Sequence, residues 1–497
     1  MRQWWTLICG ILGALIGLET GFAADSAIGW RGQDLYLSGC NVSWESYGAD
    51  FAMVEDWGNW NGYSHAATDV MFADLSAAGC NCVRWWVFCD GRGGPEFGSN
   101  SGGNVTGLDS AVLANMDDAI KLAADHGIYI IFCLWDFAML FDDSTTGQRG
   151  EHAGGHRNLV VDSTARGTFV TNALLPILQH EIPGTGYTIA THPNVLAWEV
   201  INEPEWAITE SGSVDPNISQ PVSLAQMQEF VADLTGTIHR NANQLVTVGS
   251  ACLKWNSDTA LGAVGNWWKD SALAPYDPDG ALDFYQVHYY GWMNGNYTTW
   301  SYSPLYNDTT DASLDKPTII GESPADGGST GWTVDELIDG CYSNGYAGIW
   351  SWTYMGVDYV GDWSDCSTAY TQFGSNHVAK IQLPADLDSD GDGLPNVSEF
   401  IAGTDPGSAH SCHVVTIRRT NGTVEVAFHT AAAEGVGYGG VNRYYALEES
   451  TDLVGGVWRP VSGLDRIPGA NGLVHYQSPG TNQTPRFYRA LAWFENR

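Results

Sequence analysis

The sequence has few basic residues and, beyond its N-terminal segment, no long apolar run. Its 497 residues include 21 lysines and arginines against 57 aspartates and glutamates, a formal net charge of -36. This imbalance would repel nucleic acid and anionic membranes, so we expect neither as a partner. No later apolar run is long enough for a membrane helix, so we also expect no membrane insertion. A neutral substrate fits this composition better.

The N-terminal segment has the order of features typical of an export signal. Arg2 precedes an apolar stretch that ends at Leu18, and small residues follow at Ala23 and Ala24. The stretch is too short to span a bilayer. We therefore predict a signal peptide over residues 1–23 and a protein that is secreted or extracytoplasmic, in the periplasm or at the cell surface. A buried N-terminal strand is the alternative.

The cysteines allow both disulfides and free thiols. Once the signal is removed an odd number remains, so at least one cysteine is unpaired. Cys82 and Cys133 lie in strand-like runs, as small buried residues do. Cys341 and Cys366 could form a disulfide across a late loop. Cys80 and Cys82 are not followed by a second Cys or His pair at ligand spacing, so we expect no zinc site there.

Between about Gly29 and Leu383, strand-like apolar runs alternate with helical patterns, which is typical of a parallel α/β architecture. Helix starts carry capping-box pairs such as Ser223 with Gln226. We predict a (β/α)8 TIM barrel over residues 24–383. Its strands are expected at Leu35–Val42, Cys80–Phe88, Ile128–Trp135, Val195–Asn202, Leu245–Ser250, Phe284–Tyr290, Thr318–Glu322 and Ala347–Thr353.

Two glutamates close the runs expected as the fourth and seventh strands. Glu203 follows Asn202, and Glu322 follows Gly321. Catalytic groups in this fold sit where the strands run out into the βα loops. A retaining glycosidase needs two carboxyl groups about 5 to 5.5 Å apart, one to protonate the leaving oxygen and one to attack the anomeric carbon. We predict that Glu203 and Glu322 are this pair, although Asn-Glu-Pro alone could be a loop turn.

The two roles require different protonation states. The acid must be protonated at first, so Glu203 needs a pKa raised by an apolar surround and by the nearby nucleophile. Glu322 must stay charged, and a positioned Arg84 with the Tyr290 hydroxyl would favour that form. His288 could face the site or could be an ordinary core histidine.

These motifs resemble glycoside hydrolase clan A, and within it family 5, the cellulase and β-mannanase family. The resemblance spans roughly Gly29 to Leu383 and implies an acid/base at Glu203 and a nucleophile at Glu322. No cofactor is expected for catalysis. The resemblance also implies substrate-binding roles near the reacting sugar for Arg84, Asn202, His288, Tyr290 and Trp350. Trp350 and Trp352 share one strand face at different depths, so one should be core and the other should face sugar.

The chain departs from the family pattern after the third strand. Many family 5 members have a histidine there, whereas this chain has Trp135 and Asp136, a pair that resembles some mannanases. The sugar preference therefore cannot simply be transferred. Trp135 is a candidate substrate contact, and so is Trp206, which follows Glu203 by three residues.

After the barrel, residues 384–410 have the composition of a calcium-binding linker. The loop pattern places oxygen ligands at alternate positions, with a glycine at the sharp turn and a glutamate at position twelve. It resembles a thrombospondin type 3 repeat and implies a structural Ca²⁺, although a solvated acidic loop is the alternative. The predicted ligands are Asp388, Asp390, Asp392, Leu394 and Glu399.

Residues 411–497 alternate apolar and polar positions between glycine- and asparagine-rich breaks, which predicts a small β-sandwich. It could bind carbohydrate through Trp458, Tyr476 or Trp493, serve in attachment or sorting, or be a structural appendage.

The sequence predicts a secreted, monomeric, retaining endo-β-glycanase that acts on a neutral polysaccharide. By resemblance the substrate is β-1,4-mannan or β-1,4-glucan. Within the enzyme class, a β-1,3-glucanase or an exo-β-mannosidase is the rival. Outside it, a noncatalytic polysaccharide-binding protein on the same barrel is the alternative.

Overall fold

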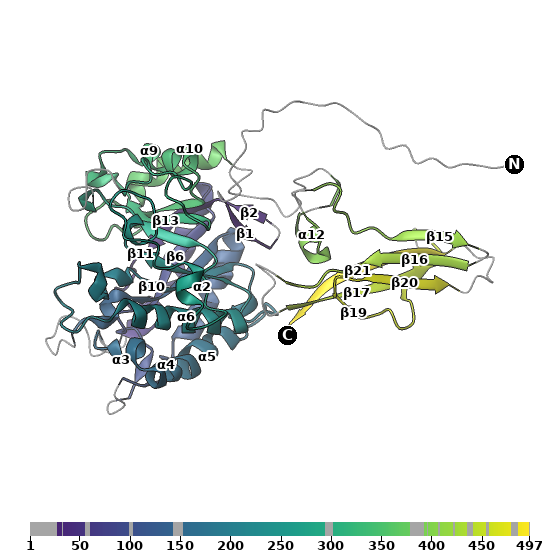
Figure 1. Ribbon diagram of the computed structural model, residues 1–497, viewed down its shortest axis with the longest axis horizontal. Coiled ribbons are helices and arrows are strands. Elements are labelled where there is room, and N and C mark those ends of the chain that lie inside the picture. The colour runs from purple at the N-terminus through teal and green to yellow at the C-terminus, as the bar shows by residue number, and fades with distance from the viewer. Residues whose placement is uncertain are drawn as a thin grey trace.

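The computed structural model describes residues 27–31, 33–54, 60–98, 103–142, 153–293, 302–377, 392–394, 396–405, 408–420, 423–434, 441–453, 457–478 and 486–496. The expected signal peptide, residues 1–23, lies outside these ranges. The described residues form a closed barrel surrounded by helices and a separate all-β region near the C-terminus (Figure 1). No helix within the described ranges is long and apolar enough to cross a membrane.

Parallel strands close the barrel in the order β10-β11-β12-β13-β14-β3-β6-β9. All eight expected strands are present, and the (β/α)8 barrel is confirmed. Most of these strands are buried along their whole length, because helices cover the outside and side chains fill the inside. The strands are β3 (Leu37–Val42), β6 (Cys82–Cys89), β9 (Tyr129–Asp136), β10 (Val195–Asn202), β11 (Leu245–Ser250), β12 (Tyr285–His288), β13 (Thr318–Pro324) and β14 (Gly348–Trp352).

The helices of the barrel begin and end at ordinary capping signals. Ser223 and Gln226 exchange both bonds of the expected capping box at the start of α6. The barrel helices are α1 (His65–Ala77), α2 (Val112–His126), α3 (Arg157–Val161), α4 (Ser163–Phe169), α5 (Leu175–Gln179), α6 (Leu224–Asn241), α7 (Asp270–Leu273), α9 (Val334–Ser343) and α10 (Trp363–Asn376). Short strand pairs in the loops are β4 (Met53–Val54) with β5 (Trp60–Asn61), and β7 (Glu96–Phe97) with β8 (Val105–Gly107).

A small hairpin packs against the start of the barrel strands. β1 (Ile28–Trp30) pairs antiparallel with β2 (Gln33–Leu35), and Trp30 packs in one buried cluster with residues that open several strands, such as Leu37 and Ile319. Trp30 also donates from its indole to the Pro193 carbonyl. This end is therefore filled, and the opposite end, where the strands finish, is free to hold a site.

The C-terminal region consists of two small antiparallel sheets. One sheet has the order β15-β16-β20, and β17 pairs with β18, β19 and β21 in the other. Val426 and Phe428 of one sheet pack with Tyr445 and Leu447 of the other, so the region has its own core, as predicted for a small all-β unit. The strands are β15 (Thr416–Thr420), β16 (Thr423–His429), β17 (Val441–Ser450), β18 (Arg459–Pro460), β19 (Ile467–Pro468), β20 (Leu473–Ser478) and β21 (Phe487–Asn496).

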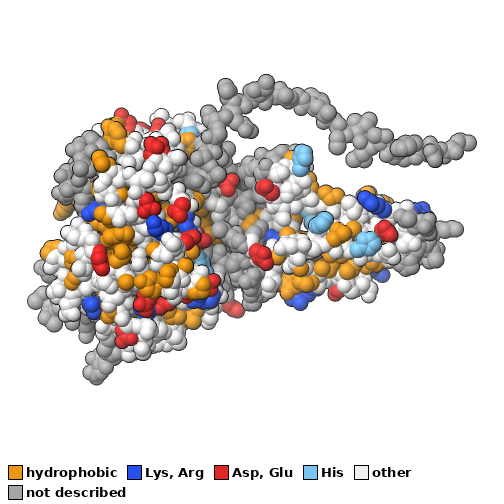
Figure 2. Space-filling view, viewed as in Figure 1, with side chains coloured by type: hydrophobic (Ala, Val, Ile, Leu, Met, Phe, Trp, Pro, Cys, Tyr) orange, Lys and Arg blue, Asp and Glu red, His pale blue; other side chains and the backbone are white. Residues whose placement is uncertain are grey.

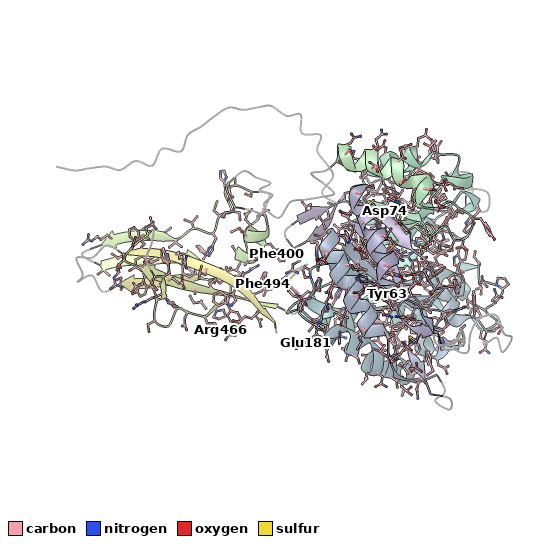
Figure 3. All side chains as sticks on the ribbon, turned by 180° about the vertical axis from the view of Figure 1, so that it is seen from behind. Tyr63, Asp74, Glu181, Phe400, Arg466 and Phe494 are labelled. Carbon is pink, nitrogen blue, oxygen red and sulfur yellow. The ribbon has the colours of Figure 1, made fainter. Side chains whose placement is uncertain are left out.

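The helix α12 (Asn396–Ala402) packs on this C-terminal unit. Phe400 meets Phe494 of β21 with ring centroids 5.7 Å apart, and Figure 3 shows the two side chains together at one end of the sheets. Arg443 donates to the Phe400 carbonyl at 3.1 Å, and the Tyr445 hydroxyl donates to the Ala402 carbonyl at 2.6 Å. The segment that carries the last predicted calcium ligand is thus part of the C-terminal unit.

Candidate active site

Glu203 stands at the end of β10, where the backbone turns sharply. Its φ of 46° is left-handed, and its N–H donates to the Gly249 carbonyl of β11 at 2.6 Å. This turn holds the side chain against His288, whose Nδ1 lies 2.7 Å from Oε1, and against Trp206, whose indole donates to Oε2 at 2.7 Å. Burial raises the pKa of Glu203 to about 7. Glu203 can therefore hold a proton near neutral pH, as a general acid must.

Glu322 lies on β13 and is held through both oxygens. Arg84 donates to Oε1 at 2.7 Å, and the Tyr290 hydroxyl donates to Oε2 at 2.8 Å. Burial raises the pKa of Glu322 above its ordinary value, while the positive charge of Arg84 acts to lower it. The two donors fix this carboxylate in place and favour its ionised form, which a nucleophile requires.

The two glutamates face each other. One oxygen of Glu203, one oxygen of Glu322 and a ring nitrogen of His288 all lie within 4.8 Å of one another. This separation fits a carboxylate pair in which one group attacks while the other transfers the proton, rather than a pair with room for a water molecule between them.

The same three side chains are the set among the described residues that could hold a metal ion. The carboxylate oxygens of this set already have hydrogen-bond partners within the protein. Glu322 is bonded to Arg84 and Tyr290, and Glu203 to His288 and Trp206. The positive charge beside Glu322 comes from the Arg84 guanidinium, so this carboxylate has its counter-ion within the protein.

Arg84 is fully buried and is the centre of the polar network. It donates from Nε and Nη2 to the two oxygens of Glu199, each at 2.5 Å, and from Nη1 to Asn41 at 3.0 Å as well as to Glu322. Asn202 accepts from Nη2 at 2.5 Å. A buried guanidinium with this many acceptors is rigid, so it fixes the nucleophile in place.

Glu199 was missed by the sequence reasoning, although it is part of the same strand as Asn202. It is fully buried and forms the bidentate pair with Arg84. The pairing of β10 with β11 shifts register between Glu199 and Asn202, so both reach Arg84 although they are three residues apart. Simple alternation along a strand would put them on opposite faces. Only the arginine opposite, which needs a counter-ion, could have indicated a buried glutamate.

His288 is fully buried, and burial lowers its pKa to about 4, so its ring is neutral at working pH. The Gln286 amide nitrogen, which donates to Glu199 at 2.9 Å, lies 3.4 Å from His288 Nε2. An amide N–H can only donate, so this contact places the ring proton on Nδ1, facing Glu203. His288 then donates to the ionised form of Glu203.

Two predicted tryptophan contacts lie elsewhere. Trp350 is fully buried in the cluster with Trp30, whereas Trp352, two residues on, belongs to a different cluster, against which Tyr290 packs. Trp135 is also fully buried, between Phe88 of β6 and Phe169 of α4. The predictions for Trp350 and Trp135 are therefore corrected. The alternation of side chains along a strand predicts that Trp350 and Trp352 share a face, but it does not predict which of the two lies deeper in the barrel.

The other predicted contacts come together as expected in space. Arg84, Asn202, His288 and Tyr290 all lie in the network around the two glutamates. Trp206 bonds to Glu203 and is grouped with Trp255 and Trp292, at centroid distances of 5.6 and 5.8 Å. Trp255 is fully buried and supports the group, whereas the partly exposed Trp206 and the exposed Trp292 offer flat apolar area near the acid.

The predicted disulfide between Cys341 and Cys366 is wrong, because both are free thiols. Cys341 is in α9 and Cys366 in α10, and the thiol that Cys366 faces is Cys40 of β3. All cysteines from Cys40 to Cys412 are free, and most are buried.

The calcium prediction is only partly within the described ranges. Asp388 and Asp390 lie outside them, whereas Asp392, Leu394 and Glu399 are described. Asp392 accepts from the Leu394 N–H at 2.8 Å, and Glu399 is fully buried and accepts from the Thr404 hydroxyl at 3.0 Å. A buried carboxylate in this position suits a cation ligand.

A parallel barrel with two facing carboxyl groups at the ends of its strands, tied to a buried arginine and a neutral histidine, is the site of a glycoside hydrolase. Curated relatives agree with this class. The chain is 28% identical over 355 residues to the mannan endo-1,4-beta-mannosidase of Mytilus edulis, which covers 67% of this chain and 87% of that protein. It is 28% identical over 377 residues to the enzyme of the same name from Cryptopygus antarcticus. That match covers 70% of this chain and 86% of the Cryptopygus protein.

Solved structures give the same result. The β-mannanase of Mytilus edulis matches with a TM-score of 0.58 at 26% identity, over 71% of this chain and 95% of that one. The endo-1,4-β-mannanase of Eisenia fetida matches with a TM-score of 0.58 at 26% identity, over 71% of this chain and 94% of the Eisenia chain. No model of a known protein family matches the chain.

Proposed function

We propose that this protein is a secreted, monomeric, retaining endo-β-1,4-mannanase. The facing Glu203 and Glu322, with oxygens within 4.8 Å, are the observation that carries the reaction. The mannan endo-1,4-beta-mannosidases that match most of the barrel support mannan as the substrate. The low content of basic residues suits a neutral polysaccharide.

In the first step Glu322 attacks the anomeric carbon, the bond from that carbon to the glycosidic oxygen breaks, and Glu203 gives its proton to that oxygen. Arg84 and Tyr290 hold Glu322 in position for the attack. The leaving chain departs with the proton, and Glu322 is left as a glycosyl ester. Neutral His288 then donates to the newly ionised Glu203 and stabilises it.

In the second step Glu203 takes a proton from water, the water oxygen attacks the anomeric carbon, and the ester bond to Glu322 breaks. Both glutamates return to their first protonation states, and the sugar keeps its β configuration. The reaction is balanced by one water molecule for each bond cleaved and uses no cofactor.

Polysaccharide digestion tests the proposal. The substrates to compare are mannan, glucomannan, carboxymethyl cellulose, laminarin and xylan. Reducing sugar should be released fastest from mannan or glucomannan. Proton NMR should show that the β-anomer of the product forms first. Laminarin as the best substrate would favour the β-1,3-glucanase. Release of single mannose units from chain ends would favour the exo-β-mannosidase, and binding without release would favour a noncatalytic protein.

We also propose that Asp388, Asp390, Asp392, Leu394 and Glu399 bind a structural Ca²⁺. The loop spacing supports this proposal, as does the buried carboxylate of Glu399 within α12, the helix that packs on the C-terminal sheets. The ion would hold the linker against that unit and would have no part in the chemistry.

A further inference from the structure

The Asn202 amide has one orientation, and two neighbours set it. An asparagine amide has an oxygen on one side and an NH₂ on the other, and the two ends have nearly the same shape. Arg84 can only donate, and its Nη2 lies 2.5 Å from Asn202 Oδ1. Asp136 accepts from Asn202 Nδ2 at 2.7 Å through its Oδ2. A donor on one side and an acceptor on the other leave a single arrangement.

Asp136 is itself fixed from two directions. It ends β9, and the strand register places it directly beside Asn202 of β10. Its other oxygen, Oδ1, accepts from the Ala138 N–H at 2.7 Å and so caps the short helix η2 (Phe137–Leu140). Both oxygens are thus occupied, and the residue is only 9% exposed.

We propose that Asp136 is a positioning residue that turns the NH₂ of Asn202 toward the substrate. One N–H of this amide bonds to Asp136, and the second remains for the reacting mannosyl unit. The inference rests on the proposed mannanase function and adds to it a residue that touches Asn202 rather than the sugar. It also assigns a role to the aspartate that ends β9, where the chain departs from the family pattern.

The alternative is that Asp136 serves only as a helix cap. Asp162 offers a control, since its side chain caps α4 by accepting from the Thr164 N–H at 2.8 Å, and it lies at an exposed position. An asparagine caps a helix about as well as an aspartate, so this exchange at a position that only caps should leave catalysis unchanged. D162N therefore measures what the change from a carboxylate to an amide at a helix cap does by itself.

Substitution D136N replaces one acceptor oxygen with an NH₂. If the remaining oxygen keeps the bond to Ala138, the new NH₂ faces the NH₂ of Asn202, and Asn202 must turn over or move away. The expected result on soluble galactomannan is a fall in kcat of about 10- to 100-fold with little change in KM, because the bound sugar is misaligned at the reacting carbon. D162N should change neither constant.

A double-mutant cycle shows whether the effect passes through Asn202. In the N202A background, D136N should lower kcat by less than about twofold, because the amide it orients is gone. Equal losses in both backgrounds, or no loss from D136N in the otherwise intact protein, would overturn the proposal.

The exchanged pair D136N/N202D separates positioning from stability. An amide at position 136 can donate to a carboxylate at 202, which also accepts from Arg84, so the bonds between the strands are restored. The exchange should recover the unfolding temperature lost in D136N but not kcat, since no N–H is offered to the sugar. Full recovery of kcat would show that only the strand contact matters. A wild-type chain inactive on galactomannan would instead contradict the proposed function itself.

Discussion

At the scale of single residues, the two glutamates have the same chemistry but different partners. Glu203 accepts one neutral indole N–H and faces a neutral imidazole, whereas Glu322 accepts from a guanidinium and a phenol. Burial raises the pKa of both, but of these two carboxylates only Glu322 accepts a hydrogen bond from Arg84. The roles of acid and nucleophile follow from this difference.

Separate substitutions should divide these roles. E203Q should slow mannan hydrolysis by about 10²- to 10⁴-fold yet retain the first step on an aryl mannobioside whose leaving group needs no proton. E322Q should lose both reactions. Steady-state and burst kinetics on the two substrates make the comparison, and equal loss of both reactions in E203Q would contradict its role as the acid.

The activity should fall on the alkaline side as Glu203 loses its proton. With a pKa of about 7, Glu203 is mostly ionised at higher pH and cannot protonate the leaving oxygen. The profile of kcat/KM for mannan should therefore decline through about pH 7. The aryl substrate should lack this limb in its first step, and an alkaline limb in that step would point to another group.

The same buried acid should lower stability at high pH. Its pKa is about 7 in the folded protein against 4.5 for an ordinary glutamate, so the folded state holds the extra proton between these values. The stability this provides is complete below about 4.5 and lost as the pH rises through about 7. E203Q should thus raise the free energy of unfolding at pH 8 but hardly at pH 4. E96Q, at an exposed position, is the control for urea titrations, and a gain at both pH values would be contrary to this account.

At the scale of elements, the barrel could be predicted more fully than the site. Apolar runs alternating with helical patterns predicted all eight strands, and the two glutamates lie at strand ends as the fold requires. What could not be predicted depends on local departures from regularity. The register shift in β10 brings Glu199 to Arg84, and the depth of Trp350 depends on the hairpin that closes the far end.

Gly249 on β11 tests how tightly the strands enclose the network. A Cβ there would lie 2.3 Å from Glu199 Oε1 and 2.9 Å from Arg84 Nη2, with no room to give. G249A should lower the free energy of unfolding by about 1 to 3 kcal/mol and reduce kcat, because Arg84 holds Glu322. Urea unfolding and mannan kinetics measure both.

Gly167 in α4 is the matched control, since a Cβ there meets nothing within 4 Å. G167A should raise stability by about 0.5 to 1 kcal/mol and leave kcat unchanged. Equal effects of the two substitutions would mean that the network is not packed against β11 as described.

At the scale of the whole molecule, charge differs between the two parts. Residues 411–497 contain eight arginines and seven acidic residues, so nearly all the negative charge belongs to the chain before them. Figure 2 shows acidic side chains spread over the visible face of the barrel. The near-neutral C-terminal unit, with α12 packed on it, is the part whose stability calcium should control.

Added Ca²⁺ should raise the unfolding temperature of the C-terminal unit and leave that of the barrel unchanged. A site saturated at about 100 times its Kd contributes about 2.7 kcal/mol. E399Q should abolish the shift, whereas E96Q should not. Calorimetry with calcium or with EDTA measures this, and a shift that persists in E399Q would exclude the proposed loop as the site.

The most direct test of the central claim is to trap the glycosyl-enzyme. A 2-deoxy-2-fluoro-β-mannosyl fluoride should react with the wild-type chain and slow the hydrolysis step, so that the ester accumulates. Peptide mass spectrometry is expected to find the added sugar on Glu322, and none in E322Q. A sugar attached to Glu203, or to Glu199, would contradict the assignment of the nucleophile on which the mechanism depends.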